Sequence, residues 1–218
     1  MSGPWDQRYA GDRYFYGTEP NAFLLEQIGF LPPGGQILCL AEGEGRNAVH
    51  LASAGFLVTA MDQSAEGLRK AGDLARSRGV AVDLRRCDLA DTWLGRECWD
   101  GVVAIFAHLP PEGRRLMHRR VVEALKPGGV VILEAYAPEQ VGRGTGGPPD
   151  PALTMTPGQL REEFEGLDID FLQQCERPVL EGEGHTGVGA VVQLRAVRRQ
   201  AAVRSRWRLR KILGPLCR

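Results

Sequence analysis

The sequence predicts an α/β fold in which a doubly wound, mostly parallel sheet carries helices on both faces. Two observations support this class. Apolar runs of strand length alternate with helical segments from Gln36 to Tyr136, and the runs "GVVAIF" and "GVVILEAY" are almost continuously apolar. Strands covered by helices on both faces have this composition, and such alternation is typical of a parallel sheet. A chain of 218 residues is long enough for one domain with a full hydrophobic core.

The expected elements follow in order along the chain. Residues 1–20 are irregular and aromatic, and a short helix is expected over Asn21–Ile28. A stripe of Leu116, Met117 and Val121 indicates the helical period of the longest predicted helix. The strands are expected at Gln36–Leu40, Leu57–Met61, Ala81–Arg86, Trp99–Phe106 and Val130–Tyr136, and the helices between them at Arg46–Ser53, Ala65–Ser77 and Pro111–Leu125.

The pattern changes after Ala137. A long Gly/Pro loop leads to a short helix over about Pro157–Phe164. Two long strands, Leu167–Val179 and Val188–Arg198, are then joined by "LEGEGHTG", which favours an antiparallel pair at the sheet edge. We expect one domain over residues 1–200, with residues 1–30 as an arm and helix that cover the site. Residues 201–218 form a basic tail, either a surface helix or a partner-binding segment.

The composition excludes several classes of protein. The formal net charge is zero, so the molecule as a whole has no electrostatic attraction to nucleic acid or to membranes. The five cysteines form no Cys-x-x-Cys pair, which argues against structural zinc and fits a reducing compartment. No apolar run is long enough to span a membrane, and no signal pattern opens the chain. We therefore expect a cytoplasmic protein without a bound metal, monomeric or homodimeric.

A glycine turn after the first expected strand indicates a ligand-binding site. Gly43 and Gly45 follow the first strand and allow a tight turn and close backbone approach to a ligand. The helix after them offers unpaired N–H groups to an anion, and Asp62, at the end of the second strand, can accept both hydroxyls of a ribose. Taken alone, this pattern also fits a nicotinamide dinucleotide.

Two further landmarks favour a different cofactor. Asp88 ends the third strand in "CDLADTW", and a Lys-Pro-Gly-Gly turn precedes the fifth. With these residues the chain resembles the class I S-adenosylmethionine-dependent methyltransferases over residues 34–136. This resemblance implies a Rossmann-like seven-stranded sheet whose C-terminal strand is antiparallel, and S-adenosyl-L-methionine as the cofactor. An NAD(P)-dependent oxidoreductase and a non-catalytic S-adenosylmethionine-binding module are the alternatives.

A narrower resemblance concerns the acceptor. "YFYGTEPNAFL" and "GEGRNAVHLASAGFLVTAMDQS" look like the tellurite-resistance branch, which is related to the thiopurine methyltransferases. That branch implies a small soft nucleophile as methyl acceptor, such as a thiol or a selenium or tellurium species. The chain departs from the family at Cys39, where an acid is usual, and at Ala41, where the first loop glycine is usual.

The resemblance also implies roles for individual residues. Glu42 or Glu44 would attract the amine of the cofactor, and Arg46 would meet its carboxylate. Asp62 would hold the ribose and Asp88 the adenine. The full set of expected cofactor contacts is Glu42, Gly43, Glu44, Gly45, Arg46, Asp62, Gln63, Asp88, Leu89 and Phe106. Glu42 and Glu44 could equally be solvated loop charges, and Asp62 could be a turn residue that ends its strand.

Acceptor contacts are expected at the carboxyl ends of the strands. His108 follows the fourth strand, Tyr16 lies in the N-terminal arm, and His185 lies in the loop of the final hairpin. These three are the catalytic candidates, and each could instead be a turn, packing or surface residue. The arm, the glycine-rich loop from Gly142 to Pro151 and the hairpin loop are expected to close over the acceptor. A closed site of this kind favours a small molecule and leaves little room for nucleic acid.

Overall fold

In the computed structural model, which describes residues 3–199, the chain forms a sheet of seven strands in the order β3-β2-β1-β4-β5-β7-β6. This confirms the predicted α/β class with an antiparallel C-terminal pair. The strands are β1 (Gln36–Leu40), β2 (Leu57–Asp62), β3 (Asp83–Arg86), β4 (Trp99–Ile105), β5 (Leu125–Tyr136), β6 (Leu167–Glu181) and β7 (His185–Arg198). The helices are α1 (Pro4–Tyr9), α2 (Ala22–Gln27), α3 (Arg46–Ser53), α4 (Ala65–Ser77), α5 (Pro111–Ala124) and α6 (Pro157–Glu163), with short 3₁₀ turns at Ile28–Phe30, Pro138–Gln140 and Pro151–Leu153.

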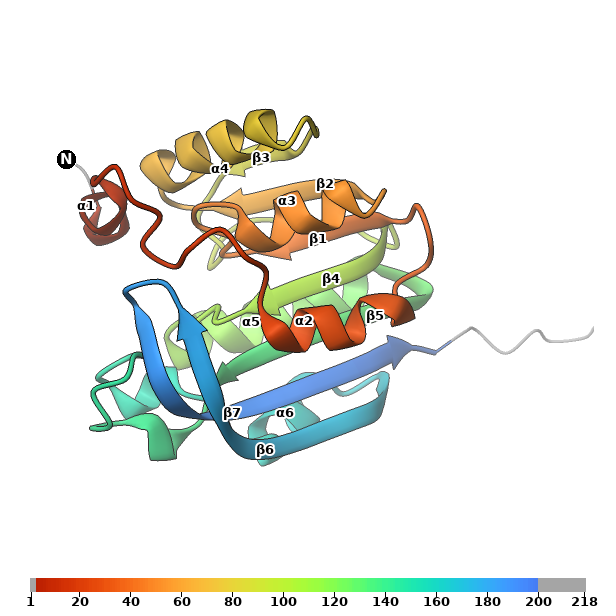
Figure 1. Ribbon diagram of the computed structural model, residues 1–218. Helices are drawn as coiled ribbons and strands as arrows, with labels where there is room; N and C mark the ends of the chain where they lie inside the picture. Colours follow the sequence, from red (N-terminus) through yellow and green to blue (C-terminus); the bar gives the residue numbers. More distant parts are fainter. Residues whose placement is uncertain (1–2, 200–218) are drawn as a thin grey trace, which may run out of the picture.

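The direction of the strands places the site. Strands β1 to β5 pair in parallel, and β7 runs antiparallel between β5 and β6. The order reverses between β1 and β4, so a crevice opens outside the carboxyl ends of these central strands. Figure 1 shows α1 and the tip of the β6–β7 hairpin at this end of the sheet. Segments from the two ends of the described chain therefore meet where a ligand would bind.

Helices cover both faces of the sheet, as the continuous apolar strands predict. Figure 1 shows α2, α3 and α4 on the near face and α5 and α6 behind. Alternate residues of β1 point to opposite sides: Ile37 and Cys39 pack with Leu51 of α3, while Leu38 and Leu40 share a core with α5 and α6. Within residues 3–199, no helix is both long and apolar enough to cross a membrane.

The structure corrects three local predictions. Residues 4–9, expected to be irregular, form α1, because Pro4 starts the helix and Asp6 both caps it and bonds the Ser64 hydroxyl at 2.6 Å. Strand β5 begins at Leu125 and includes the Lys-Pro-Gly-Gly segment, and the preceding helix ends at Ala124. Strand β3 begins at Asp83, two residues later than expected. The predicted tail 201–218 lies outside the described residues.

The final hairpin also differs from the prediction. Ladder pairing between β6 and β7 continues to Glu181 and His185, so the loop is shorter than "LEGEGHTG" suggests. His185 is therefore the first residue of a strand and is buried, not exposed in a loop. Glycines 182 and 184 permit this because they pack against the backbone or rings of Phe15 and Tyr16, where a side chain would collide.

Candidate active site

The glycine turn after β1 has the conformation that the sequence predicts. Gly43 and Gly45 have φ of 60° and 92°, the left-handed region that glycine adopts without strain. Gly45 also lies directly against Ala71 of α4, so a Cβ at Gly45 would come within 2.6 Å of the Ala71 Cβ. Ala41, in the position of the missing glycine, is held at φ 51°, which is unfavourable for a residue with a Cβ.

Glu42 caps the helix that follows the turn. Its Oε1 accepts hydrogen bonds from the backbone N–H groups of Asn47 and Ala48 at 2.9 and 2.8 Å. These are orphan donors in the first turn of α3, where a negative charge is favourable. Burial nevertheless raises the pKa of Glu42 to about 7, and the two N–H bonds only partly oppose it. Glu42 is therefore a buried carboxyl that is poised to titrate near neutral pH.

Glu44 has protein partners on both oxygens. Oε1 pairs with the Lys70 ammonium of α4 at 2.6 Å, and Oε2 accepts the Tyr16 N–H at 3.3 Å. Both ionic side chains are almost fully buried. The Lys70 ammonium also donates to the Arg13 carbonyl at 2.6 Å. This pair therefore anchors the N-terminal arm to the glycine turn, and a contact between Glu44 and the cofactor amine stays a prediction.

Asp62 holds two turns together. Its two oxygens accept the Gly43 N–H and the Ser64 N–H, each at 2.8 Å. A carboxylate has about four acceptor positions, so capacity remains for the hydroxyls of a ribose. Burial raises the pKa of Asp62 above its ordinary value, with the backbone N–H bonds acting in the opposite direction. Asp62 thus ends β2 beside the glycine turn, and its contact with a ribose stays a prediction.

A pocket of about 430 Å³ lies beside Asp62, at the ends of β2 and β3. Gln63 and Asp88 line it on one side, and Pro4, Trp5 and Asp6 of α1 on the other. Asp88 uses one oxygen to accept the Ala90 N–H at 2.9 Å and keeps its side chain exposed. Leu89 is buried in the adjoining core. An aromatic wall, a free carboxylate oxygen and an amide suit a nucleobase, so these residues fit the nucleoside end of S-adenosylmethionine.

Tyr9 is a site residue that the sequence reasoning did not select. It is buried at the end of α1, and a Cβ at Gly43 would lie 2.7 Å from its hydroxyl. Its ring also packs on Gly67 of α4. Burial raises its pKa far above the ordinary value, so the phenol is neutral. Tyr9 covers the glycine turn, and with Trp5 it makes α1 part of the cofactor side of the site.

The three catalytic candidates lie in one aromatic cluster beyond the carboxyl ends of β4 and β5. The His185 ring lies 4.7 Å from Tyr16 and 4.6 Å from Phe106, measured between ring centroids. Phe106 stacks on Tyr136 at 4.6 Å, and His108 lies 5.8 Å from Tyr136 on a nearly parallel plane. Phe106 has φ 54°, a strained backbone of the kind found at functional sites.

Three segments contact this cluster, and their closure over an acceptor stays a prediction. The arm contributes Tyr16, and its Phe15 carbonyl accepts the Glu183 N–H of the hairpin at 2.8 Å. A Cβ at Gly146 of the glycine-rich loop would come within 3.0 Å of both the Tyr136 hydroxyl and the His185 ring. The hairpin supplies His185 itself. Between these segments His185 is 4% exposed.

His185 and His108 differ in their partners. His185 Nδ1 lies 3.1 Å from Glu181 Oε2, so we infer that Nδ1 carries the proton and that Nε2 is the free acceptor. Burial lowers the pKa of His185, although Glu181 opposes this. His108 Nδ1 lies 2.9 Å from the Leu153 carbonyl, and burial lowers its pKa to about 4. Both rings are neutral at neutral pH, and only His185 is oriented by a carboxylate.

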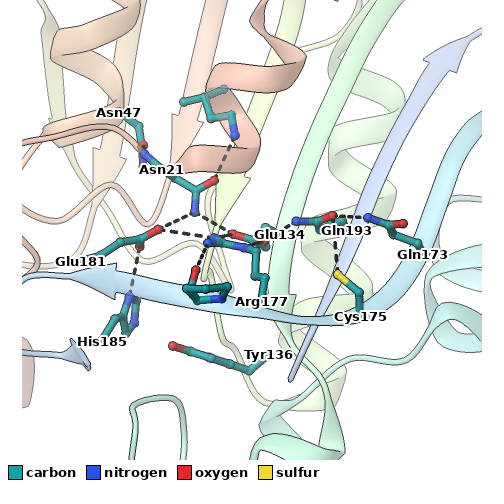
Figure 2. Close-up of polar contacts among 12 residues, drawn as sticks. Asn21, Asn47, Glu134, Tyr136, Gln173, Cys175, Arg177, Glu181, His185 and Gln193 are labelled. Carbon is teal, nitrogen blue, oxygen red and sulfur yellow. Dashed lines mark hydrogen bonds and ion pairs between the residues drawn. The ribbon is translucent and has the colours of Figure 1, made fainter. Parts of the chain in front are cut away.

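A buried ionic network supports the cluster, and sequence reasoning missed most of it. Figure 2 shows Glu134 of β5 surrounded by donors from three segments. Arg177 of β6 donates through Nε at 2.8 Å, Gln193 of β7 donates at 2.7 Å, and Asn21, the N-cap of α2, donates at 2.6 Å. Asn21 also donates to Glu181 at 2.9 Å. The network therefore joins the arm, the sheet and the hairpin.

Arg46 completes this network from the start of α3. Its Nη2 donates to Glu181 Oε2 at 2.6 Å, and both side chains are 8% exposed. Glu181 thus accepts from Arg46 and His185 on the same oxygen, and these bonds lower its pKa to about 2 against the effect of burial. Arg46 Nη1 is buried and has no hydrogen-bond partner among residues 3–199. The Tyr136 hydroxyl is also buried and has no hydrogen-bond partner among the described residues.

The fold and a match over part of the chain indicate what this protein is similar to. Residues 37–129 match the family described as "Methyltransferase domain". The mixed seven-stranded sheet of the described residues, with its antiparallel C-terminal pair, is the Rossmann-like fold of class I S-adenosylmethionine-dependent methyltransferases. Residues 37–129 therefore resemble a methyltransferase domain, and this resemblance implies S-adenosylmethionine as the cofactor.

Three known proteins show how similar this chain is to individual methyltransferases and related structures. A glycine/sarcosine N-methyltransferase of Halorhodospira halochloris is 34% identical over 137 residues, which are 60% of this chain and 47% of that protein. The chain thus matches about half the length of this curated relative. An S-adenosylmethionine-dependent methyltransferase of Methanosarcina mazei has TM-score 0.66 at 18% identity, over 84% of this chain and 100% of that one. TehB of Haemophilus influenzae has TM-score 0.68 at 16% identity, over 89% of this chain and 66% of that one.

Proposed function

We propose that this protein transfers a methyl group from S-adenosylmethionine to a small acceptor that binds against His185. The observation that carries the proposal is the enclosed cluster itself. A neutral histidine, oriented by a buried carboxylate, lies among aromatic rings next to the glycine turn. When bound, S-adenosylmethionine supplies an electrophilic methyl carbon on a sulfonium, which leaves as a neutral thioether.

The residues of the chain supply position, exclusion of water and a proton acceptor. Gly43 and Gly45 allow the tight turn after β1, and Asp62 with Asp88 would hold the nucleoside of the cofactor. The site would align a lone pair of the acceptor with this methyl carbon, so that the new bond would form as the carbon–sulfur bond broke. An acceptor that carries a proton on the attacking atom would give it to His185 Nε2, while Glu181 stabilises the resulting imidazolium. Alignment in a closed site contributes the rest of the rate enhancement.

This arrangement favours an acceptor that loses a proton on methylation, namely a thiol or an amine. The thiol is the soft nucleophile that the sequence resemblance predicts, and the name of the curated relative supports the amine. Selenium and tellurium species that are already anionic would need no base. The roles of Glu42, Gln63, Leu89 and Phe106 toward the cofactor remain part of this proposal.

A thermal-shift comparison tests the cofactor. A ligand at about 100 times its dissociation constant stabilises a protein by ~2.7 kcal/mol, which should raise Tm by roughly 5–10 °C. S-adenosylhomocysteine should do so and NAD should not; the reverse would indicate the oxidoreductase alternative. Formation of S-adenosylhomocysteine is then measured with small thiols and amines, and with peptides and RNA. Efficient methylation of only the macromolecules would contradict the enclosed site.

A further inference from the structure

Arg46 has an unused hydrogen-bond donor at the centre of the site. Its side chain is 8% exposed, and one terminal nitrogen is occupied by Glu181 at 2.6 Å. The other, Nη1, has no partner among the described residues. Leaving a buried N–H of a charged group without an acceptor is unfavourable, and guanidinium groups bind carboxylates well. An incoming carboxylate would satisfy this donor.

The Tyr136 hydroxyl is a second unpartnered donor near the same place. Its side chain is 1% exposed, and its ring centroid lies 5.4 Å from that of His185. A Cβ at Gly146 would come within 3.0 Å of the hydroxyl, so the group faces the region that the glycine-rich loop covers. Its pKa is raised by burial, and the phenol stays protonated and able to donate.

The position of Arg46 links it to the acceptor more closely than to the nucleoside. Arg46 and His185 bond the same oxygen of Glu181, at 2.6 and 3.1 Å. The pocket lined by Gln63 and Asp88 lies instead at the ends of β2 and β3, against α1. Arg46 is thus joined to the proton acceptor through a shared partner, Glu181.

We propose that Arg46 Nη1 binds a carboxylate of the acceptor, so that the substrate is a small carboxylic acid bearing a thiol or an amine. The inference rests on the proposed function, because it concerns the acceptor of that reaction. The Tyr136 hydroxyl is the second donor available to the same acceptor.

Matched probe pairs test this substrate class. Thioglycolate is compared with 2-mercaptoethanol, and sarcosine with 2-(methylamino)ethanol, so that each pair differs in a carboxylate replaced by a hydroxymethyl group. S-adenosylhomocysteine formation gives kcat/KM for each probe. We expect the carboxylate member of an active pair to be preferred at least about tenfold, as one charge-assisted contact implies. Equal turnover within every active pair would overturn the proposal.

Two variants test whether Arg46 causes the preference for the carboxylate probe. Arg46→Lys can keep an ion pair with Glu181 but has no second nitrogen, so the preference should fall below about threefold while the affinity for S-adenosylhomocysteine stays within about twofold. The control is Arg114→Gln, because the buried guanidinium of Arg114 is paired with Glu163, outside the network of Glu134 and Glu181. It should lower Tm and keep the preference. If Arg46→Lys weakens S-adenosylhomocysteine tenfold and keeps the preference, Arg46 binds the cofactor carboxylate and the proposal is wrong.

A binding measurement separates this proposal from the proposed function. Thioglycolate is added to the protein saturated with S-adenosylhomocysteine, and Tm is recorded for the native protein and for Arg46→Lys. Stabilisation of the native protein alone supports the carboxylate site even if no probe is methylated, and in that case the proposed function fails by itself. No stabilisation together with no turnover would overturn both.

Discussion

Replacing Glu42 with Gln should stabilise the protein at alkaline pH, although it removes a helix-capping charge. Both backbone N–H bonds end on Oε1, an atom that glutamine keeps. The pKa of Glu42 is raised from 4.5 to about 7, mainly by burial. Because one pKa unit is worth about 1.4 kcal/mol, ionising Glu42 in the folded state costs about 3 kcal/mol by about pH 8.

The sign of the pH dependence follows from the raised pKa. Below about pH 4.5, Glu42 is protonated in both the folded and unfolded states, and its stabilising contribution is fully present. As pH rises through about 7, the unfolded chain ionises first and this contribution is lost. Glutamine does not titrate, so the advantage of Glu42→Gln should grow from near zero at about pH 4.5 to about 3 kcal/mol at about pH 8.

Denaturant unfolding of both proteins across this pH range measures the difference directly. Comparing the two proteins cancels other titrations, including that of His108. The matched control is Glu44→Gln, in the same turn, which leaves the buried Lys70 ammonium without its carboxylate. It should destabilise by about 3 kcal/mol. If Glu42→Gln destabilised the protein at about pH 8 as much as this control does, the assignment of a desolvated carboxyl at Glu42 would be refuted.

Three further variants test other parts of the site. Asp62→Ala should lower Tm and should weaken the affinity for S-adenosylhomocysteine tenfold or more, because two backbone N–H groups and a ribose lose their acceptor. Unchanged affinity by calorimetry would make Asp62 a turn residue only. Ala41→Gly should stabilise by up to about 1 kcal/mol, because relief of φ 51° is partly offset by the flexibility of unfolded glycine; a clear drop in Tm would contradict this. His185→Gln should lower kcat for thiols and amines by about 100-fold and leave S-adenosylhomocysteine affinity within about twofold, whereas unchanged kcat would remove the proton-acceptor role.

Much of the fold could be predicted because its determinants are local. The apolar runs of β4 and β5 can be stable only between two layers of helices, and the glycine turn and Asp62 follow directly from the ends of β1 and β2. Helix α1 escaped prediction because it has only six residues, too few for a helical stripe. It forms through contacts with α4 and Ser64, which the sequence does not reveal.

The acceptor side was harder to predict, for a related reason. Arg177 and Glu181 lie four residues apart on an edge strand, where charged side chains usually face water. Their burial depends on Asn21 and Glu134, which are distant in the chain. The glycines at 182, 184 and 187 predict a loop around His185. The four-residue spacing of Glu181 and His185 indicates their contact only once the strand register is known.

The hydrogen bonds of Asn21 constrain the order in which the parts of the protein fold. This side chain joins Glu181, which is 160 residues away in the chain, and such distant contacts form late because closing a large loop is entropically costly. During synthesis, the strands from β1 to β5 can pair before β6 and β7 have emerged, whereas the Asn21 side chain gains its partner Glu181 only after β6 has been made. A nascent or C-terminally shortened chain would therefore have its glycine turn and Asp62 in place before the acceptor chamber exists. Cofactor binding would be gained earlier in the life of the chain than substrate selection.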